Sequence, residues 1–376
     1  MMEADVMIGA GMKVTCGREE FVGRLGVVSR AVSTRSSVQI LAGVLLEATG
    51  GELRLAATDM ELSLRTSLDA QVESDGSVVV PGRLLVDIAR LLPDADVQIE
   101  HRLEENVLAV TCGTASYRLH TYSAEDFPRL PDVDDTQVFT VDAEALLETV
   151  SQVSRSASRD ESRPVLTGIL ARFEPGKLVM AATDSYRLAV KETGLAGSSQ
   201  ELEAIIPARA LAELARIVGS ATQLELGVQE NQVAFRTEDA VLTTRRIDGQ
   251  FPNVKQLLPE QFEHVVTLPR NELLDVVKRV SIMAQRNSPL RLRFSEGELE
   301  VSAQTQDVGE AKESLPAPFT GDALEIGFNP EFLRDGIDSV QSDEVKLKLI
   351  SPLRPAVLDG AEGDPTYLLM PIRLAG

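Results

Sequence analysis

The sequence has no tryptophan, and aromatic residues make up only 4% of its 376 residues. Proteins that bind single-stranded nucleic acid without sequence preference stack the bases on aromatic side chains. This composition therefore argues against a surface of that kind. The two cysteines, Cys16 and Cys112, are too few for a disulfide framework or a zinc site. We expect a cytoplasmic protein with reduced thiols.

Histidines and long apolar runs are also scarce. The three histidines, His101, His120 and His264, do not have the spacing of metal ligands. No nucleophile–base pair or phosphate-binding loop is recognisable, so we expect no catalysis, no metal and no cofactor. No stretch approaches the roughly 20 apolar residues of a membrane helix, and the N-terminus does not resemble a signal peptide. We therefore expect no membrane partner.

Positive charge is in short supply as well. Lysine and arginine number 37 against 58 acidic residues, which gives a net charge of −21. Proteins that hold nucleic acid by neutralising phosphates are usually basic. A role on DNA would therefore need positive charge gathered locally, or a hold on DNA that does not depend on affinity.

What the sequence does contain is one pattern that occurs three times. Asp59 and Asp184 lie 125 residues apart, and Pro81 and Pro207 lie 126 apart. Solenoid repeats have periods of about 20–50 residues, so each copy is a whole domain. The boundaries that we predict are an N-terminal extension, expected to be disordered, and three domains, here called copies one, two and three: residues 1–11, 12–134, 135–264 and 265–376.

Each copy reads as two rounds of helix plus antiparallel strands. Apolar residues at helical spacing open the copies at 18–32, 142–157 and 270–284. Glycine-bearing turns between alternating apolar runs then predict hairpins, and prolines mark the first turn of a second helix. The hairpin glycines and the helix prolines are Gly50, Gly51, Gly176, Gly297, Pro81, Pro207 and Pro330. The pattern predicts an α+β fold with helices segregated from the sheet.

The Thr-Asp pairs at Thr58-Asp59 and Thr183-Asp184 stand at equivalent strand ends. We interpret them as structural turns in which the aspartate accepts backbone N–H groups, rather than as catalytic carboxylates. A residue that recurs once per domain usually serves the fold.

Basic residues recur at matched places on the predicted helices. Arg83 and Arg90 are seven residues apart, as are Arg209 and Arg216, so each pair lies on one helical face. The first helices carry further cations, at Arg24, Arg30, Arg155, Lys278 and Arg279. From spacing alone, a solvated surface and a basic lining remain equally open. Copy three has Glu331 and Asp338 at the matched places, so any lining is uneven.

The chain ends in TYLLMPIRL. This segment is consistent with a last core strand, and equally with the wall of an apolar groove for a peptide, because Met and Pro line adaptable sites.

The threefold repeat, the motif AATDSYRLAV, the linker DGQFPNV and the ending YLLMPIRL together resemble the bacterial sliding clamp family, the beta subunit of DNA polymerase III. The resemblance covers residues 12–374. It implies three DNA-clamp domains, each with two helices packed on antiparallel sheet. It also implies a homodimer in which two chains close head to tail into a ring with pseudo-sixfold symmetry around double-stranded DNA.

The function that this resemblance implies is not catalytic. The ring is expected to be a processivity factor in DNA replication, nucleoid-associated in the cytoplasm. It would tether the replicative DNA polymerase alpha subunit, and also meet the clamp loader, other polymerases and repair proteins, through short apolar motifs. A ring holds DNA by topology, which agrees with an acidic protein that needs little affinity.

The resemblance also assigns site residues. The partner-peptide pocket would comprise Leu166, Thr183, Ser185, Tyr186, Arg187, Leu188, Pro252, Leu257, Asn329, Phe332, Leu353, Pro355, Met370, Pro371, Ile372 and Arg373. The DNA-facing cations would be Arg24, Arg30, Arg35, Arg83, Arg90, Arg155, Arg163, Arg209, Arg216, Lys278 and Arg279. The dimer interface would join Tyr117 and Leu119 to Ile282 and Met283.

The pocket departs from the family pattern in places. Ser185 and Tyr186 stand where many relatives carry Gly-His, and Gln256 stands where a basic residue is common. An alternative is therefore a clamp paralogue with an altered partner pocket, acting in specialised repair or in tolerance of pocket-blocking inhibitors.

Overall fold

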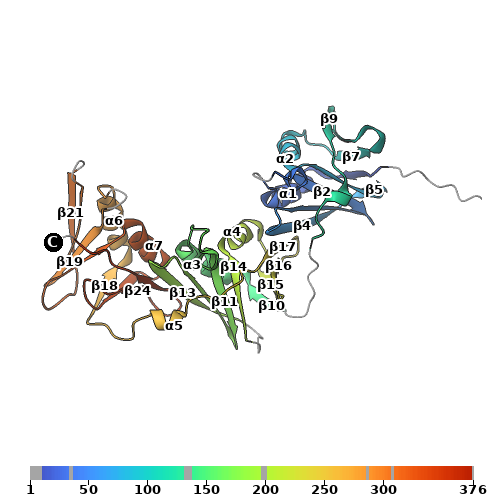
Figure 1. The fold of residues 1–376 in the computed structure, drawn as a ribbon. Coiled ribbons are helices and arrows are strands. Elements are labelled where there is room, and N and C mark those ends of the chain that lie inside the picture. The colour runs from blue at the N-terminus through green and yellow to red at the C-terminus, as the bar shows by residue number, and fades with distance from the viewer. Residues whose placement is uncertain are drawn as a thin grey trace, which may run out of the picture. The chain divides into compact units, whose positions relative to one another are not determined.

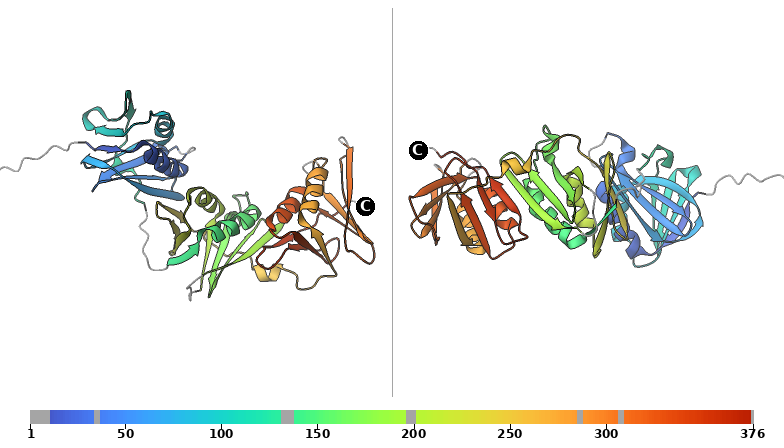
Figure 2. Two further views of the ribbon diagram at one scale, coloured as in Figure 1. Left: turned by 180° about the vertical axis from the view of Figure 1, so that it is seen from behind. Right: turned by 90° about the horizontal axis from the view of Figure 1, so that it is seen from below.

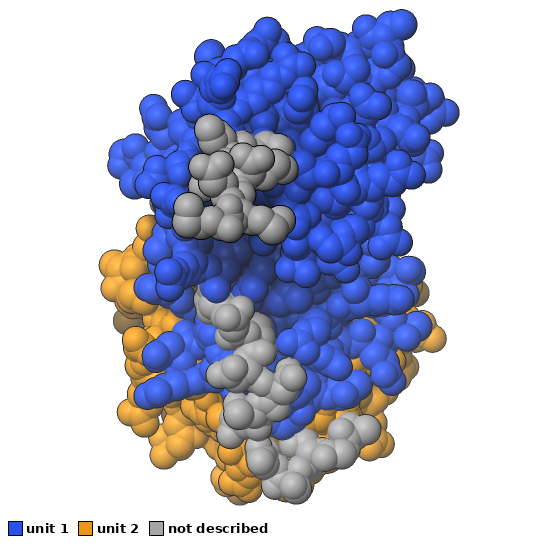
Figure 3. Space-filling model, turned by 90° about the vertical axis from the view of Figure 1, so that its right-hand side faces the viewer, with its two compact units in different colours: residues 1–140, 213–245 blue, residues 141–212, 246–376 orange. Residues whose placement is uncertain are grey.

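The computed structural model describes residues 11–33, 37–130, 138–195, 201–284, 288–305 and 309–374. It divides into two compact units, residues 1–140 with 213–245 (unit 1) and residues 141–212 with 246–376 (unit 2) (Figure 3). Residues 1–10 of the predicted N-terminal extension lie outside the described residues, as does Arg35.

The predicted α+β elements recur in each copy (Figure 1). Copy one contains β1 (Lys13–Cys16), α1 (Arg18–Val28), β2 (Gly43–Thr49), β3 (Glu52–Thr58), β4 (Leu62–Asp69), β5 (Gln71–Ser74), β6 (Gly76–Pro81), α2 (Gly82–Leu91), β7 (Val97–Arg102), β8 (Val107–Cys112) and β9 (Ala115–His120). Copy two contains β10 (Val138–Asp142), α3 (Ala143–Val153), β11 (Gly168–Glu174), β12 (Lys177–Thr183), β13 (Arg187–Gly194), β14 (Leu202–Pro207), α4 (Ala208–Ile217), β15 (Gln223–Val228), β16 (Gln232–Arg236) and β17 (Ala240–Arg245).

Copy three follows a one-turn helix in the linker, α5 (Val254–Leu257). It contains β18 (His264–Pro269), α6 (Arg270–Ser281), β19 (Leu290–Ser295), β20 (Glu298–Thr305), β21 (Gly309–Pro316), β22 (Leu324–Phe328), α7 (Pro330–Ser339), β23 (Glu344–Leu349), β24 (Ala356–Asp359) and β25 (Thr366–Leu369). Short 3₁₀ turns follow α1 and α3, at Ser29–Ala31 and Ser154–Ser156.

The predicted hairpins and first helices are confirmed. Strands β2–β3, β11–β12 and β19–β20 pair antiparallel around the glycine-bearing turns. The periodic apolar residues of the helices are buried, such as Phe21 and Leu25 in α1 and Leu273 and Val277 in α6. In unit 2, α3, α6 and α7 lie on one face of the sheet and α5 lies on the other (Figures 1 and 2).

The placement of the helix prolines is only partly right. Pro330 is the first residue of α7, whose N-cap, Asn329, accepts hydrogen bonds from the Glu331 and Phe332 amides. Pro81 and Pro207 instead end the preceding strands, and α2 and α4 begin one residue later. At Pro81 the ψ angle is 109°, which is extended rather than helical.

Within the described residues the strands form four sheets, and two of these run across copies. Strand β4 of copy one pairs with β17 of copy two, within unit 1. Strand β13 of copy two pairs with β25 of copy three, within unit 2. We call these ladders the first and the second junction. Because both ladders are continuous hydrogen-bonded sheet, the compact units cut through copy two instead of following the repeats.

Candidate functional site

The second junction begins with the turn at Thr183–Arg187. The Thr183 hydroxyl donates to the Arg187 carbonyl, and Asp184 Oδ1 accepts the amides of Tyr186 and Arg187 at 2.9 and 3.0 Å. Ser185 has a φ of 80°, a left-handed conformation that few side chains favour. This geometry confirms the structural interpretation of the Thr-Asp pair. It leaves the Tyr186 side chain 62% exposed.

One face of this junction is an apolar cluster assembled from distant parts of the chain. Leu188 of β13 lies opposite Leu368 of β25 in the ladder, and both are buried. They belong to one core cluster with Phe251 and Val254 of the linker and Val357 of β24. The cluster therefore ties copy two, the linker and copy three together on the α5 side of the sheet.

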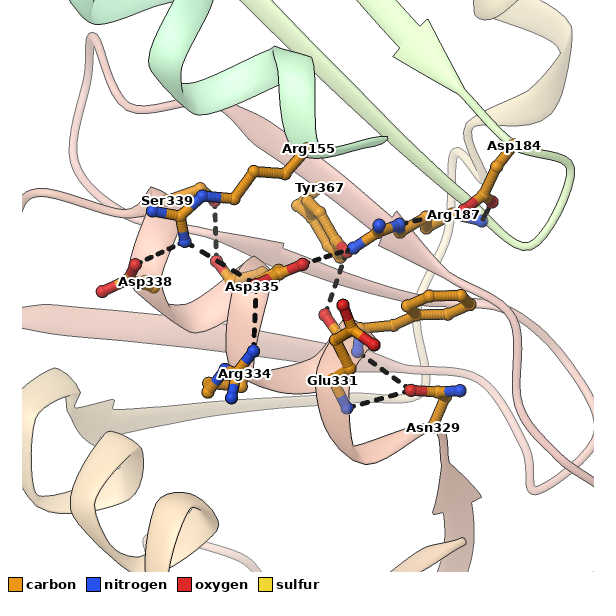
Figure 4. Close-up of polar contacts among 12 residues, drawn as sticks. Arg155, Asp184, Arg187, Asn329, Glu331, Arg334, Asp335, Asp338, Ser339 and Tyr367 are labelled. Atoms are coloured by element: carbon orange, nitrogen blue, oxygen red, sulfur yellow. Dashed lines mark hydrogen bonds and ion pairs between the residues drawn. The ribbon is translucent and has the colours of Figure 1, made fainter. Parts of the chain in front are cut away.

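The opposite face holds a buried charge (Figure 4). Arg187 donates to Asp184 at 3.0 Å and to Asp335 of α7 at 2.7 Å, and its guanidinium lies 4.2 Å from the centre of the Phe332 ring. The Tyr367 hydroxyl donates to the Phe332 carbonyl at 2.9 Å. We call these residues the Arg187 clamp. They join the turn of copy two to the second helix of copy three.

Arg187 stays charged within the Arg187 clamp. Burial alone would lower the pKa of Arg187, but Tyr367 and the carboxylates of Asp335 and Asp184 raise that pKa above its ordinary value. Burial raises the pKa of Tyr367, so the phenol stays neutral and can donate its proton. The clamp is thus a cation between carboxylates and a neutral hydroxyl.

The resemblance assigned Arg187 to the partner-peptide pocket. In the structure its guanidinium instead forms ion pairs with Asp184 and Asp335 of the same chain, and the residue is only 7% exposed. Thr183, Leu188 and Leu166 are likewise buried. Asp335, Tyr367 and Leu368 were missed as site residues, although the alternation of Leu188 and Arg187 along β13 hinted that the two would face different partners.

Other predicted pocket residues do reach the surface. Large apolar side chains that are at least one third exposed are Tyr186, Leu257, Leu353, Met370 and Ile372. The amide of Met370 donates to the Tyr186 carbonyl at 2.9 Å, and that of Ile372 to Gly327 at 2.7 Å. Asn329, Pro252, Pro355 and Pro371 are half-buried, and Arg373 is exposed. The C-terminal segment therefore divides into a buried strand, β25, and an exposed tail attached beside the turn, which fits both sequence interpretations in part.

Several cations predicted to face DNA are held in ion pairs. Arg24 pairs with Asp239 at 2.7 Å, Arg216 with Glu213 at 2.7 Å, and Arg279 with Glu313 at 2.7 Å. Arg163 donates to the Ser185 hydroxyl at 3.0 Å, in the turn at Thr183–Arg187. Arg83, Arg90, Arg209 and Lys278 are exposed on their helices. The predicted basic lining is therefore partly neutralised by acids, although most of its described members are exposed.

Two further ion pairs occupy equivalent places in the repeat. Arg30 and Arg155 occupy equivalent 3₁₀ turns after the first helices of copies one and two. Arg30 lies 3.3 Å from Glu213 of α4, and Arg155 lies 2.5 Å from Asp338 and 3.7 Å from Asp335 of α7. In both junctions an arginine of one copy meets the second helix of the next copy.

The predicted dimer residues differ in exposure. Ile282 is 79% exposed, whereas Met283 and Tyr117 are half-buried and Leu119 is already buried in the protomer. Leu119 can therefore support a seam between chains but offers little surface to it.

The described residues were also compared with what a metal site or a reactive thiol would need. Among the described residues no group of three or more His, Cys, Asp or Glu side chains could hold a metal ion. Cys16 and Cys112 are free and buried, and burial raises the pKa of Cys16 to about 12, which keeps it a thiol. In the same part of the chain, no helix is long and apolar enough to cross a membrane.

Fold and site together define a class: three α+β copies joined by shared sheets, with an apolar core cluster at the second junction. Comparison with known proteins identifies the family. The N-terminal, central and C-terminal domains of the DNA polymerase III beta subunit match residues 12–131, 140–253 and 255–373. The chain belongs to the DNA polymerase III beta subunit family, whose members are non-catalytic sliding clamps.

Individual relatives agree along their whole length. The beta sliding clamp of Streptomyces coelicolor is 36% identical, over 97% of this chain and all of that one. The DNA polymerase sliding clamp of Bacillus subtilis superposes with a TM-score of 0.94 at 25% identity, over 97% of this chain and 100% of that chain. The Pseudomonas aeruginosa clamp bound to griselimycin gives 0.90 at 29%, with the same coverage. The family and the α+β class predicted from the sequence are confirmed.

Proposed function

We propose that two copies of this chain close head to tail into a ring around duplex DNA, and that the ring tethers a replicative polymerase through the second-junction pocket. One observation carries the ring: the two internal junctions use the same pair of strands, and a third such pair is left over. The partner-peptide, DNA-facing and dimer residues predicted from the sequence are part of this proposal.

The leftover strands follow from the repeat. Strands β4 and β13 each pair with the last strand of the next copy, β17 and β25. Their equivalent in copy three is β21, and the equivalent of β17 and β25 in copy one is β9. Both lie at sheet edges in the described chain. Exposed edge strands invite pairing, so β21 of one chain is matched to β9 of another, and two such seams close a dimer.

The internal junctions also give the register of the seam. Leu64 lies opposite Leu242 in the first junction, and Ala189 lies opposite Tyr367 in the second. Transferred through the hairpin registers, the same position places Ala311 of one chain opposite Tyr117 of the other. An alanine would then again face a tyrosine, as in the second junction.

Helix surfaces support the same seam. Leu84 and Leu91 of α2 are exposed, the latter by 80%, whereas their equivalents on α4, Ala210 and Ile217, are buried. In copy three, Ile282 replaces the junction arginines Arg30 and Arg155. Apolar residues that are exposed only where the chain offers no preceding copy (Leu84, Leu91) or no following copy (Ile282) are suited to a permanent interface.

The seam is tested by Ile282→Asp in sedimentation velocity. We expect the parent chain to sediment as a dimer and the variant as a monomer, because a buried carboxylate without a partner is costly. Val265→Asp, at an exposed apolar position on β18, is the matched control and should stay dimeric. A monomeric parent, or an unchanged Ile282→Asp dimer, would refute the proposed seam.

The ring itself is tested on DNA of two topologies. The protein is loaded with its clamp loader onto a nicked circle, and the isolated complex is then linearised. Retention on the circle with loss on cutting is the expected result, since topology rather than affinity holds a ring. Equal retention on both forms would show that direct contacts hold the protein and would contradict the ring.

The pocket is tested with a labelled peptide carrying the clamp-binding segment of the replicative polymerase alpha subunit. Met370→Ala should weaken binding by tenfold or more, because apolar anchors dominate such sites, while Val265→Ala should leave it unchanged. If the ring forms but the peptide does not bind, the chain acts instead as a clamp paralogue with an altered partner pocket.

A further inference from the structure

A cleft lies at the first junction, within unit 1. Its volume is about 220 Å³, and its walls include Thr58, Met60, Pro128 and Thr243. These residues come from β3, the turn before β4, the linker after copy one, and β17. The cleft is thus built from strand ends of two copies and the linker between them.

Its position corresponds to the second junction, where the sequence resemblance places the partner-peptide pocket. Thr58 and Met60 correspond to Thr183 and Ser185, and Pro128 follows Phe127 as Pro252 follows Phe251. The turn geometry is the same: Met60 has a φ of 78° against 80° for Ser185, and the Asp59 carboxylate accepts the amides of Glu61 and Leu62. The repeat has therefore produced the same turn at both junctions.

The chemistry of the two junctions differs along one row of the sheet. In the first junction the row that crosses β3, β4 and β17 reads Thr58, Ser63, Thr243. In the second junction the row that crosses β12, β13 and β25 reads Thr183, Leu188, Leu368. Hydroxyls thus stand where the second junction has leucines, so the first cleft is suited to a polar ligand.

One of these hydroxyls is unsatisfied. The Thr58 hydroxyl donates to the Leu62 carbonyl at 2.9 Å and lies 3.2 Å from that of Ser63. Thr243 is only 3% exposed, and within the described chain its Oγ1 makes no hydrogen bond. A buried hydroxyl without a partner is unfavourable, so it marks a place where a ligand atom would be stabilised.

The rim favours an anion. Arg129 and Arg245 are exposed along the cleft and are opposed there by one carboxylate, Glu61. Against a chain of net charge −21, a cleft with two cations and one anion is locally positive. A carboxylate can accept hydrogen bonds from both a hydroxyl and arginines.

We propose that this cleft binds an aspartate or glutamate side chain at the tip of a partner protein's segment. A peptide fits better than a free anion, because Met60 adds an apolar surface that is 49% exposed beside the charged rim. The linker residues Pro128, Arg129 and Leu130 also line a larger hollow of about 700 Å³. A segment anchored in the small cleft therefore has room to continue along the linker.

Methyl NMR of the full-length protein tests this with two built-in reporters, because Met60 lines the first cleft and Met370 belongs to the second-junction pocket. The protein, ¹³C-labelled at its methionine methyl groups, is titrated with acetyl-Gly-Asp-Gly-amide. We expect a saturable shift of the Met60 signal in the millimolar range, with the Met370 signal unchanged. Acetyl-Gly-Leu-Gly-amide should not shift Met60.

Variants locate the contact. Thr243→Val, which removes only the hydroxyl, and Arg245→Gln should each weaken the Asp peptide at least fivefold. Thr267→Val on β18 and Arg172→Gln on β11 are the matched controls and should bind like the parent. Equal shifts of Met60 by the Asp and Leu peptides, no shift at all, or unchanged affinity in Thr243→Val and Arg245→Gln would overturn the proposal. Sodium acetate that binds as well as the peptide would overturn the choice of a peptide ligand. Neither the ring nor the polymerase peptide enters this test, so its failure is separable from theirs.

Discussion

The first and second junctions share one backbone ladder and place opposite chemistry on its two faces. In the second junction, Leu188 and Leu368 form the apolar face, and Arg187 and Tyr367 form the polar one. In the first, Ser63 and Thr243 stand at the positions of those leucines. Leu62 and Leu242, both buried, stand at the positions of Arg187 and Tyr367. The polarity of the two faces is inverted.

This inversion distinguishes the backbone pairing that joins the copies from the side chains that make the two junctions different. Strand register is set by backbone pairing and is the same in both, as are the arginine-to-second-helix pairs of Arg30 and Arg155. Side-chain polarity differs between the two junctions although their backbone pairing is the same. Neighbouring residues of a strand point to opposite faces, so the side chains of each face can change without altering the pairing. The proposed seam extends the comparison, since its register would place Glu310 opposite Arg118 at the position of the leucines.

The largest effect is expected from breaking the Arg187 clamp. Arg187→Met removes the nearest cation of the buried Asp335 carboxylate, leaving only Arg155 and Arg334 at 3.7 and 3.8 Å, and should lower the free energy of unfolding by about 3–5 kcal/mol. Leu62→Met at the equivalent place in the first junction should cost less than about 1.5 kcal/mol. Urea denaturation of both variants measures the difference. Similar losses would mean that the clamp is not what distinguishes the second junction.

Making the outer row of the second junction resemble the first is expected to have the next largest effect. Leu368→Thr removes apolar contact with the core cluster and buries a hydroxyl among apolar neighbours. The free energy of unfolding should fall by about 2–3 kcal/mol, and binding of the polymerase peptide should weaken. Denaturation and peptide titration check the two parts. Wild-type values for both would show that this row does not define the pocket.

The reverse change in the first junction should stabilise the protein. Thr243→Val keeps the shape of the side chain and removes the unsatisfied hydroxyl, so we expect a gain of about 1 kcal/mol in the free energy of unfolding. Thermal denaturation without added peptide measures the gain. A loss of similar size would show that the hydroxyl is satisfied in solution.

The smallest effects are expected at the ion pairs that the junctions share. Arg30→Ala and Arg155→Ala each remove a pair between partly exposed side chains, so each should cost only about 0.2–1 kcal/mol. The losses should shrink at 1 M salt, because such pairs are screened. Two equal, small losses would support a shared frame, whereas a large loss at one junction alone would contradict it.

Local signals in the sequence were sufficient for the elements and the turns. Helical spacing located α1, α3 and α6, and the Thr-Asp pairs located the turns, because these structures depend on neighbours a few residues apart. The clamp could not be found in this way. Arg187 sits in a motif that reads as an exposed turn, and its partner Asp335 is 148 residues further along the chain. Burial and charge at Arg187 depend on a ladder whose two strands come from different copies.

Matched arginines on matched helices have a second interpretation besides contact with a common ligand. Arg30 and Arg155 form ion pairs with acids at equivalent places in the two internal junctions. Repetition of a residue in each copy does not by itself distinguish contact with a common ligand from an equivalent contact between neighbouring copies. The acids opposite these arginines, Glu213 and Asp335, occupy equivalent positions on α4 and α7, and that pairing is the sequence signal that separates the two cases.

The continuous ladders also bear on how freely each joint can change. Copies joined by a short linker meet at a very high effective concentration, so their contact persists even when individual side chains favour it little. The two internal ladders are joints of this kind, and they have diverged until one presents leucines and the other presents hydroxyls beside a cleft. A seam between separate chains has no such support and must hold at the protein's actual concentration. Leu84, Leu91 and Ile282 are the exposed apolar residues on which that association would depend.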